Sequence, residues 1–139
     1  MERHGRAVDR ATVGYVIRGE VEPLYDALTA YANEDGGFGN ALEPDVGLAD
    51  SFTLATTVAL QMLAMFGAAC ENKLVAKAMN YLAGTMKSDV NAWQIVPENL
   101  GDSTHAPALV EIQGYRRIHD QPSRRDSRVH VSMARFLRR

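Results

Sequence analysis

The stretch DSFTLATTVALQMLAMF, residues 50–66, carries the strongest helical pattern of the chain and decides its fold class. Asp50 or Ser51 is a suitable N-cap, and Gly67 follows as a stop signal. Apolar residues occupy one face at helical spacing and also cover much of the opposite face. They are Phe52, Ala55, Ala59, Met62, Leu63 and Phe66 on the first face, and Leu54, Val58, Leu60 and Met65 on the second. Because a helix that is apolar nearly all round is buried on most sides, this segment is predicted to be a central core helix.

Three further helices are predicted around this one. The first covers residues 6–18, the second begins with Pro23 in its first turn, and the last covers residues 72–86. The second helix is expected to continue to the Gly-Gly turn at residues 36–37. No stretch shows the alternation of β-branched residues that is typical of strands. The sequence therefore predicts an all-α fold.

The composition limits the class of protein. The chain has 139 residues, which fits one domain, and 46% of them are hydrophobic, which suffices for a core. Its longest apolar stretch, residues 54–69, is interrupted by polar residues and a glycine, so no membrane span is expected. The N-terminus is charged and lacks the apolar region of a secretory signal, and Cys70 is the single cysteine. A cytoplasmic location is the expectation.

Charge divides the chain into two segments. Residues 1–114 carry seven Lys/Arg against fifteen Asp/Glu, a net charge of −8, and residues 115–139 carry eight Arg against two Asp, a net charge of +6. We therefore expect a helical domain over 1–114 and a flexible, Arg-rich tail over 115–139. Tyr115 and Phe136 are the only aromatic residues of the tail, so nucleic-acid binding is not expected. A solvated extension and a tail folded onto the acidic domain are the remaining alternatives.

A weak internal repeat links the ends of the second and fourth predicted helices. In each copy a helix ends, a turn follows, and an aromatic residue closes the turn. The aromatic residues are Phe38 and Trp93, about 55 residues apart. Gly36 and Gly37 allow the first turn to reverse at positive φ. The second copy lacks these glycines, and its loop is expected to be longer by several residues.

Residues 31–45, YANEDGGFGNALEPD, resemble the QNPDGGFG-x-x-LEPD stretch of bacterial proteins that contain prenyltransferase/squalene-cyclase repeats. Pro97 and the segment THAP, residues 104–107, are similar to the proline and PHAP elements of the same proteins. Ala32 stands where those proteins have glutamine, and Ala-Leu at 108–109 where they have an aromatic pair. The resemblance implies an α/α toroid, of which this chain would form a part built from about two helical hairpins.

A closed toroid needs about five to seven hairpins, because each hairpin buries its face only against its neighbours. The chain is therefore expected to represent a truncated member, one end of a longer protein whose reading frame was cut or shifted near residues 108–115. The change of charge and the end of the resemblance near that point motivate this hypothesis. The unsealed apolar helix faces of such a segment would favour self-association or binding of a partner chain.

Candidate site residues follow from the resemblance and from residue chemistry. Glu43 and Asp45 belong to the Glu-Pro-Asp element, and His105 titrates near neutral pH, so these three are the candidate catalytic residues. The resemblance implies that they surround the mouth of a helix-lined cavity, with Phe38 and Trp93 as candidate substrate-binding residues. The structural alternatives are turn carboxylates, a histidine bonded to backbone and aromatic packing residues.

A metal is expected only under one condition. The carboxylates of Glu34, Asp35, Glu43 and Asp45 would suit Mg²⁺ if a diphosphate is bound, but no dedicated metal site is predicted. The alternative is that Asp35 caps the Gly-Gly turn. The Asp-x-Asp-Asp motif of class II terpenoid cyclases is absent, and so is a second thiol for zinc.

The predicted function is a toroid segment of unknown reaction that binds an isoprenoid or other small apolar ligand, without full activity alone. The alternative is a non-catalytic helical interaction module.

Overall fold

The computed structural model describes residues 5–95, 97, 99 and 100. This part of the chain contains four α-helices and no strand: α1 Ala7–Arg18, α2 Glu22–Thr29, α3 Thr53–Met65 and α4 Lys73–Thr85. The all-α prediction is confirmed for these residues. None of the four helices has the length and apolar character needed to cross a bilayer. The predicted tail over 115–139 lies outside the described residues.

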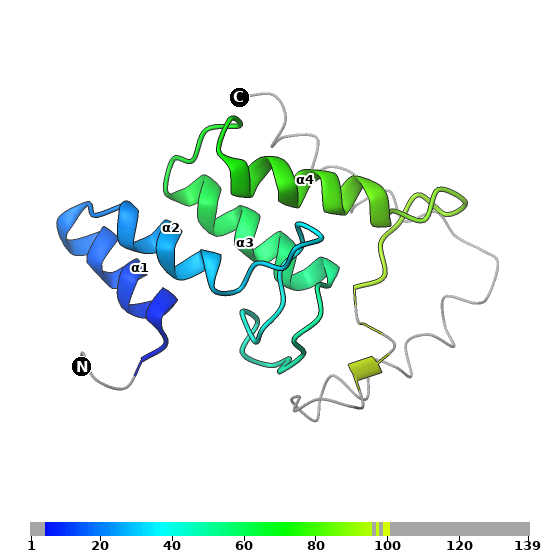
Figure 1. The fold of residues 1–139 in the computed structure, drawn as a ribbon, viewed down its shortest axis with the longest axis horizontal. Coiled ribbons are helices and arrows are strands. Elements are labelled where there is room, and N and C mark those ends of the chain that lie inside the picture. The colour runs from blue at the N-terminus through cyan, green and yellow to red at the C-terminus, as the bar shows by residue number, and fades with distance from the viewer. Residues whose placement is uncertain (1–4, 96, 98, 101–139) are drawn as a thin grey trace, which may run out of the picture.

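The helices lie next to one another in chain order, with α1 and α4 at opposite edges (Figure 1). α1 packs against α2, and α3 packs against α4. The rings of Tyr15 on α1 and Phe66 at the end of α3 meet edge to face, with their centroids 4.5 Å apart. This contact connects the first helix pair to the second.

Two helix ends follow the signals in the sequence. Gly19 adopts a left-handed conformation at φ 73° and donates its N–H to the carbonyl of Tyr15 at 2.8 Å, which ends α1. The side chain of Asn72 accepts a hydrogen bond from the N–H of Leu74 at 2.9 Å and so caps the start of α4. Local sequence therefore determines these two boundaries.

Two other helix ends differ from the prediction. Phe52 is the N-cap residue of α3, and no side chain caps this helix, so the predicted capping by Asp50 or Ser51 is wrong. The Ser51 hydroxyl instead donates to the carboxylate of Asp35 at 2.7 Å. α2 ends at Thr29, well before the Gly-Gly turn, because the following residues form a bridge with that turn.

The core surrounds α3 and includes the loop between α2 and α3. Five residues of α3 are buried: Ala55, Thr56, Ala59, Leu60 and Leu63. The loop buries four apolar side chains beside them: Phe38, Leu42, Val46 and Leu48. α3 is thus largely buried as predicted, but Met65 at its C-terminal end is 66% exposed, so that end is open to solvent.

Candidate functional site

The loop between α2 and α3 folds back on itself and approaches α4. Ala32 and Phe38 form an isolated antiparallel bridge around the Gly-Gly turn. Gly36 has φ 88°, and a Cβ at this position would lie 2.8 Å from the carbonyl oxygen of Lys77 on α4. Glycine is therefore required at position 36 both by the backbone conformation and by the close approach to α4.

Phe38 is anchored to the first turn of α3 by its backbone. Its N–H donates to the hydroxyl of Thr56 at 3.0 Å, and its carbonyl accepts from the N–H of Phe52 at 3.1 Å. The Thr56 hydroxyl donates in turn to the carbonyl of Phe52 at 2.9 Å. Only 1% of the surface of Phe38 is exposed. These contacts hold the Gly-Gly turn in place over the start of α3.

A second, polar set of contacts surrounds Asp35. One carboxylate oxygen of Asp35 accepts from the N–H of Gly37 at 2.9 Å and from the Ser51 hydroxyl at 2.7 Å. Asp35 therefore caps the Gly-Gly turn, which is the structural alternative considered from the sequence. The side-chain amide of Asn33 donates to the Ser51 hydroxyl at 2.9 Å and to the carbonyl of Ala49 at 3.0 Å. The network joins the two ends of the loop.

Tyr81 extends this network from α4. Its hydroxyl donates to the carbonyl of Ser51 at 2.9 Å. Burial of the phenol, and secondarily the nearby carboxylate of Asp35, raises the pKa of Tyr81 above its usual value. The neutral phenol is therefore the form that the folded protein favours, and it acts as a hydrogen-bond donor that ties α4 to the loop.

The second copy of the repeat forms a similar turn after α4. Lys87 and Ala92 make an isolated antiparallel bridge, and the indole N–H of Trp93 donates to the carbonyl of Leu82 at 2.7 Å. Asn91 supplies the positive φ, at 49°. The prediction of a loop longer by several residues is wrong, because Trp93 follows the end of α4 no farther than Phe38 follows the end of α2.

Glu43 and Asp45 lie in a different part of the loop. The N–H of Val46 donates to the carbonyl of Glu43 at 3.0 Å, which closes a β-turn with Pro44 at its second position. The Glu43 side chain is half-buried and Asp45 is exposed. Neither residue lines the hollow described below. Their placement agrees with the structural alternative, in which both are turn carboxylates.

Arg6 holds the preceding turn. The N–H of Leu42 donates to the carbonyl of Gly39 at 3.0 Å, and the two central residues have positive φ, 53° at Asn40 and 61° at Ala41. This is the geometry of a type I′ turn. The guanidinium of Arg6 donates to the carbonyls of Ala41 and Leu42 at 3.1 and 2.8 Å. Arg6 therefore connects the start of α1 to the loop.

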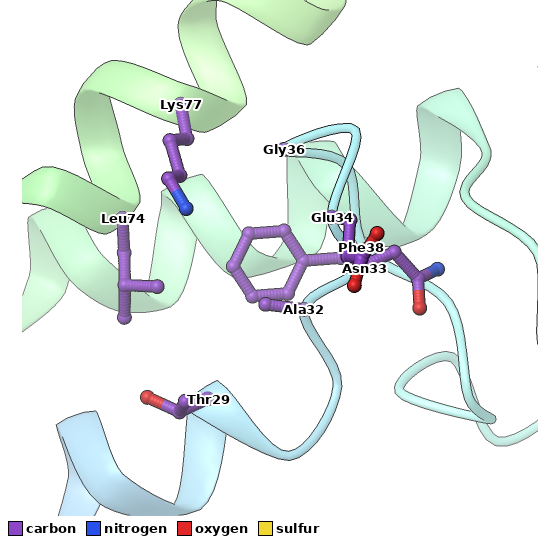
Figure 2. Close-up of a pocket in the computed structure, with 8 residues that line it drawn as sticks. All are labelled: Thr29, Ala32, Asn33, Glu34, Gly36, Phe38, Leu74 and Lys77. Carbon is purple, nitrogen blue, oxygen red and sulfur yellow. The ribbon is translucent and has the colours of Figure 1, made fainter.

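A hollow of about 240 Å³ opens between the end of α2, the Gly-Gly turn and α4 (Figure 2). Its lining residues are Thr29, Ala32, Asn33, Glu34, Gly36, Phe38, Leu74 and Lys77. Figure 2 shows the ring of Phe38 pointing toward α4, with the Lys77 side chain directed into the same space. Because Phe38 is almost fully buried, its ring forms the floor of the hollow. Lys77 and Glu34 are exposed and give the rim of the hollow one positive and one negative charge, respectively.

The structure brings together only part of the predicted site. Phe38 lines the hollow, whereas Trp93 does not. His105 lies outside the described residues. Within residues 5–95, 97, 99 and 100, no three His, Cys, Asp or Glu side chains form a group that could hold a metal ion.

Sequence reasoning did not assign Lys77 or Thr29 to the site. Lys77 lies on a polar face of α4, and Thr29 lies at the end of α2. In the sequence, neither residue differs from an ordinary surface residue. Both reach the hollow only because α2 and α4 meet beside the Gly-Gly turn. No signal in the sequence indicates this meeting.

Comparison with known proteins yields no match of this chain to a protein-family model, to a curated protein or to a solved structure.

Proposed function

We propose that the chain is a segment of an α/α toroid and that its hollow binds a small ligand with an apolar body and an anionic group. The observation that carries this proposal is the composition of the hollow. Leu74 and Ala32 provide apolar surface beside the buried ring of Phe38, and Lys77 provides a positive charge next to it. Such a combination of an apolar wall with a few polar groups is typical of small-molecule sites.

The arrangement of the helices supports the toroid part of the proposal. Consecutive helices contact each other as α1 with α2 and α3 with α4. Each pair ends in a turn that is closed by an aromatic residue, Phe38 or Trp93. Two similar units that follow one another in the chain fit the order in which a repeat architecture stacks its units.

The size of the hollow limits the ligand. Pockets for drug-sized molecules have volumes of roughly 300–1,000 Å³. At about 240 Å³ the hollow is smaller than this range, so it suits a short apolar group rather than a long isoprenoid chain. A five-carbon isoprenyl phosphate or another small apolar anion is the proposed ligand class.

The charges of the rim favour one negative group over two. Lys77 would pair with a monophosphate or carboxylate, whereas the carboxylate of Glu34 would repel further negative charge. A diphosphate would therefore need Mg²⁺, whose preferred ligands are oxygen atoms such as those of Glu34 and the phosphates. Mg²⁺ dependence distinguishes these two kinds of ligand.

The proposal concerns binding and assigns no reaction. Glu43 and Asp45 do not line the hollow, and the Arg6 hydrogen bonds and the turn at Pro44 account for their part of the loop. Of the five predicted site residues, Phe38 alone enters the proposal.

Ligand binding is tested by chemical-shift perturbation and by thermal unfolding of the full chain. The probes are dimethylallyl monophosphate, dimethylallyl diphosphate and inorganic phosphate, each with and without Mg²⁺. We expect the isoprenyl compounds to shift the resonances of Leu74 and Gly36 and to raise the melting temperature, and inorganic phosphate to do so much less.

Two lysines of α4 provide a matched pair of variants. Lys77→Gln removes the charge at the hollow, and Lys73→Gln removes another exposed charge one helical turn away that does not line it. We expect the first variant to weaken binding about tenfold or more and the second to leave it unchanged. Equal effects of the two substitutions, or no saturable binding of any probe, would contradict the proposal.

A helical interaction module is the second candidate function. The observation that favours it is a group of exposed apolar residues on α1: Val13, Val16 and Ile17. Exposed apolar surface of this kind is typical of interaction sites. The two candidates use different parts of the molecule and are not exclusive.

A further inference from the structure

Helix α1 has apolar residues on two opposite faces. Val8, Ala11 and Tyr15 face the core, where Val8 is fully buried and Tyr15 contacts the ring of Phe66. The opposite face carries Val13, Val16 and Ile17, which follow the i, i+3, i+4 spacing of one helix face. A helix that is apolar on both faces is normally covered on both.

The outer face of α1 is not covered by another helix in the part of the chain that the structure describes. Val13, Val16 and Ile17 are 55%, 73% and 70% exposed. α1 also lies at the edge of the helical layer, with α2 on one side of it (Figure 1). We call the three residues the α1 stripe.

Charged residues flank the stripe in a defined order. Arg10, Gly14 and Arg18 follow one another at intervals of four residues and therefore form one flank of α1. Arg18 and Glu20 form an ion pair at 2.8 Å that lies over Gly14. A Cβ added at Gly14 would be 2.9 Å from Arg18 Nη2 and 3.4 Å from Glu20 Oε2. This flank therefore has a cation near its N-terminal end and a carboxylate near its C-terminal end.

We propose that the α1 stripe is a docking surface for the α1 stripe of a second copy of this chain, with the two helices antiparallel. In a two-fold pairing the same patch meets itself in reverse, so Val13 of one copy would face Ile17 of the other. The same reversal places Arg10 opposite the carboxylate of Glu20 on the second copy. In this register Val13 meets Ile17 and Arg10 meets Glu20 at both ends of the pair, while Asp9, which continues the stripe toward the N-terminus, keeps its own ion pair with Arg6.

The size of the patch sets the expected strength. Stable interfaces bury roughly 1,200–2,000 Å² in total, and one helix against one helix buries less than this. We therefore expect a dimer that dissociates in the micromolar range, stable at high protein concentration and lost on dilution. The hollow at Phe38 is not part of this surface, so dimer formation and ligand binding are tested independently.

Sedimentation equilibrium of the full chain over micromolar to millimolar concentrations tests the proposal. We expect a monomer–dimer equilibrium for the natural chain and a monomer for Val16→Lys/Ile17→Lys. Both substituted side chains are exposed and lysine favours helix, so the helical circular dichroism should be unchanged. Met65→Lys, at another exposed apolar residue, is the control that should still dimerise.

Charge reversal tests the orientation. Glu20→Arg should weaken dimerisation about tenfold, because Arg10 would then face two cations in the other copy. Adding Arg10→Glu to this variant should restore dimerisation, since each carboxylate again meets arginine. A monomer at every concentration, a dimer that survives the α1 stripe substitutions, or failure of the second charge change to restore binding would overturn the proposal.

Discussion

Gly36 and Asn91 occupy equivalent positions in the two turns that follow α2 and α4. Each lies two residues before the aromatic residue that closes its turn, and each has positive φ, 88° at Gly36 and 49° at Asn91. Asparagine is the residue that most often replaces glycine in this region, because its short polar side chain tolerates it. The second turn therefore keeps the conformation of the first without its glycines.

Substitution of Gly36 by alanine should destabilise the protein strongly. The new Cβ would adopt a disfavoured φ and would press on the backbone carbonyl of Lys77, which cannot move aside as a side chain would. We expect the free energy of unfolding, measured by urea denaturation, to fall by about 3 kcal/mol. Gly84→Ala is the control, because a Cβ there meets nothing within 4 Å and alanine favours the helix, so stability should rise by roughly 0.5 kcal/mol. A similar loss in both variants would contradict the assigned contact.

Asn91 should accept glycine but not alanine. Asn91→Ala places a Cβ in the left-handed region without the polar side chain, and the free energy of unfolding should fall by about 1 kcal/mol. Asn91→Gly should stay within about 0.5 kcal/mol of the natural protein. Asn80→Ala, at an exposed position of α4, is the matched control and should stabilise the protein slightly, because alanine is the better helix former. If both Asn→Ala variants changed stability in the same direction, the role of positive φ would be refuted.

Ala41→Gly should stabilise the loop. Ala41 has φ 61° at the third position of the type I′ turn, where glycine is preferred after asparagine. Relief of this strain should exceed the entropy cost of glycine in the unfolded chain, so the free energy of unfolding should rise by roughly 0.5 kcal/mol. The same substitution in α4, Ala76→Gly, should lower it by about 1 kcal/mol. Thermal denaturation of the two variants gives the comparison, and destabilisation by Ala41→Gly would argue against the turn assignment.

The hydroxyl of Thr56 should be essential for the position of Phe38. Thr56→Val keeps the shape of the side chain but leaves the buried N–H of Phe38 without its acceptor, which should lower the free energy of unfolding by about 2 kcal/mol. Thr56→Ser keeps the hydroxyl and loses one methyl group, with an expected cost of about 1 kcal/mol. Amide hydrogen exchange at Phe38 should accelerate in the valine variant only. Protection of that amide in Thr56→Val would show that the hydrogen bond does not hold the turn.

Tyr81 should make stability fall at alkaline pH. Burial and the Asp35 carboxylate raise the pKa of Tyr81, so the neutral phenol stabilises the fold fully below the unfolded pKa of about 10. This contribution is lost as pH rises through the higher pKa of the folded state. Tyrosinate absorbance should therefore show a late-titrating component that is lost in Tyr81→Phe, with Tyr25→Phe as the control substitution. A late group present in both variants would exclude Tyr81 as its source.

The sequence allowed a correct prediction of the region of each helix, though not of the end of α2, because the signals of a helical segment are mostly local. Gly19 and Asn72 act on the chain within a few residues of themselves, so the end of α1 and the start of α4 lie close to their predicted positions. Ser51 could not be interpreted in this way. It has two available partners, the start of α3 and the carboxylate of Asp35, and the choice depends on how closely the loop packs against α4.

The candidate site was less predictable for the same reason. Phe38 was identified because an aromatic residue after a Gly-Gly turn is visible in the sequence. Lys77 was not, since its approach to Phe38 depends on the packing of α4 beside a loop that precedes it by some forty residues. Glu43 and Asp45 share the acidic loop with Glu34, yet their own β-turn directs them elsewhere.

The sequence by itself determined the all-α class, the region of each of the four helices and the turn that requires glycine at position 36. These features depend on backbone conformation and on apolar periodicity, which act over one or two turns of chain. Only the tertiary structure decided that α2, α4 and the loop meet at the hollow, and that the outer face of α1 has no covering helix in the described chain. Such contacts depend on how whole helices pack, because packing brings together residues whose separation in sequence carries no local signal.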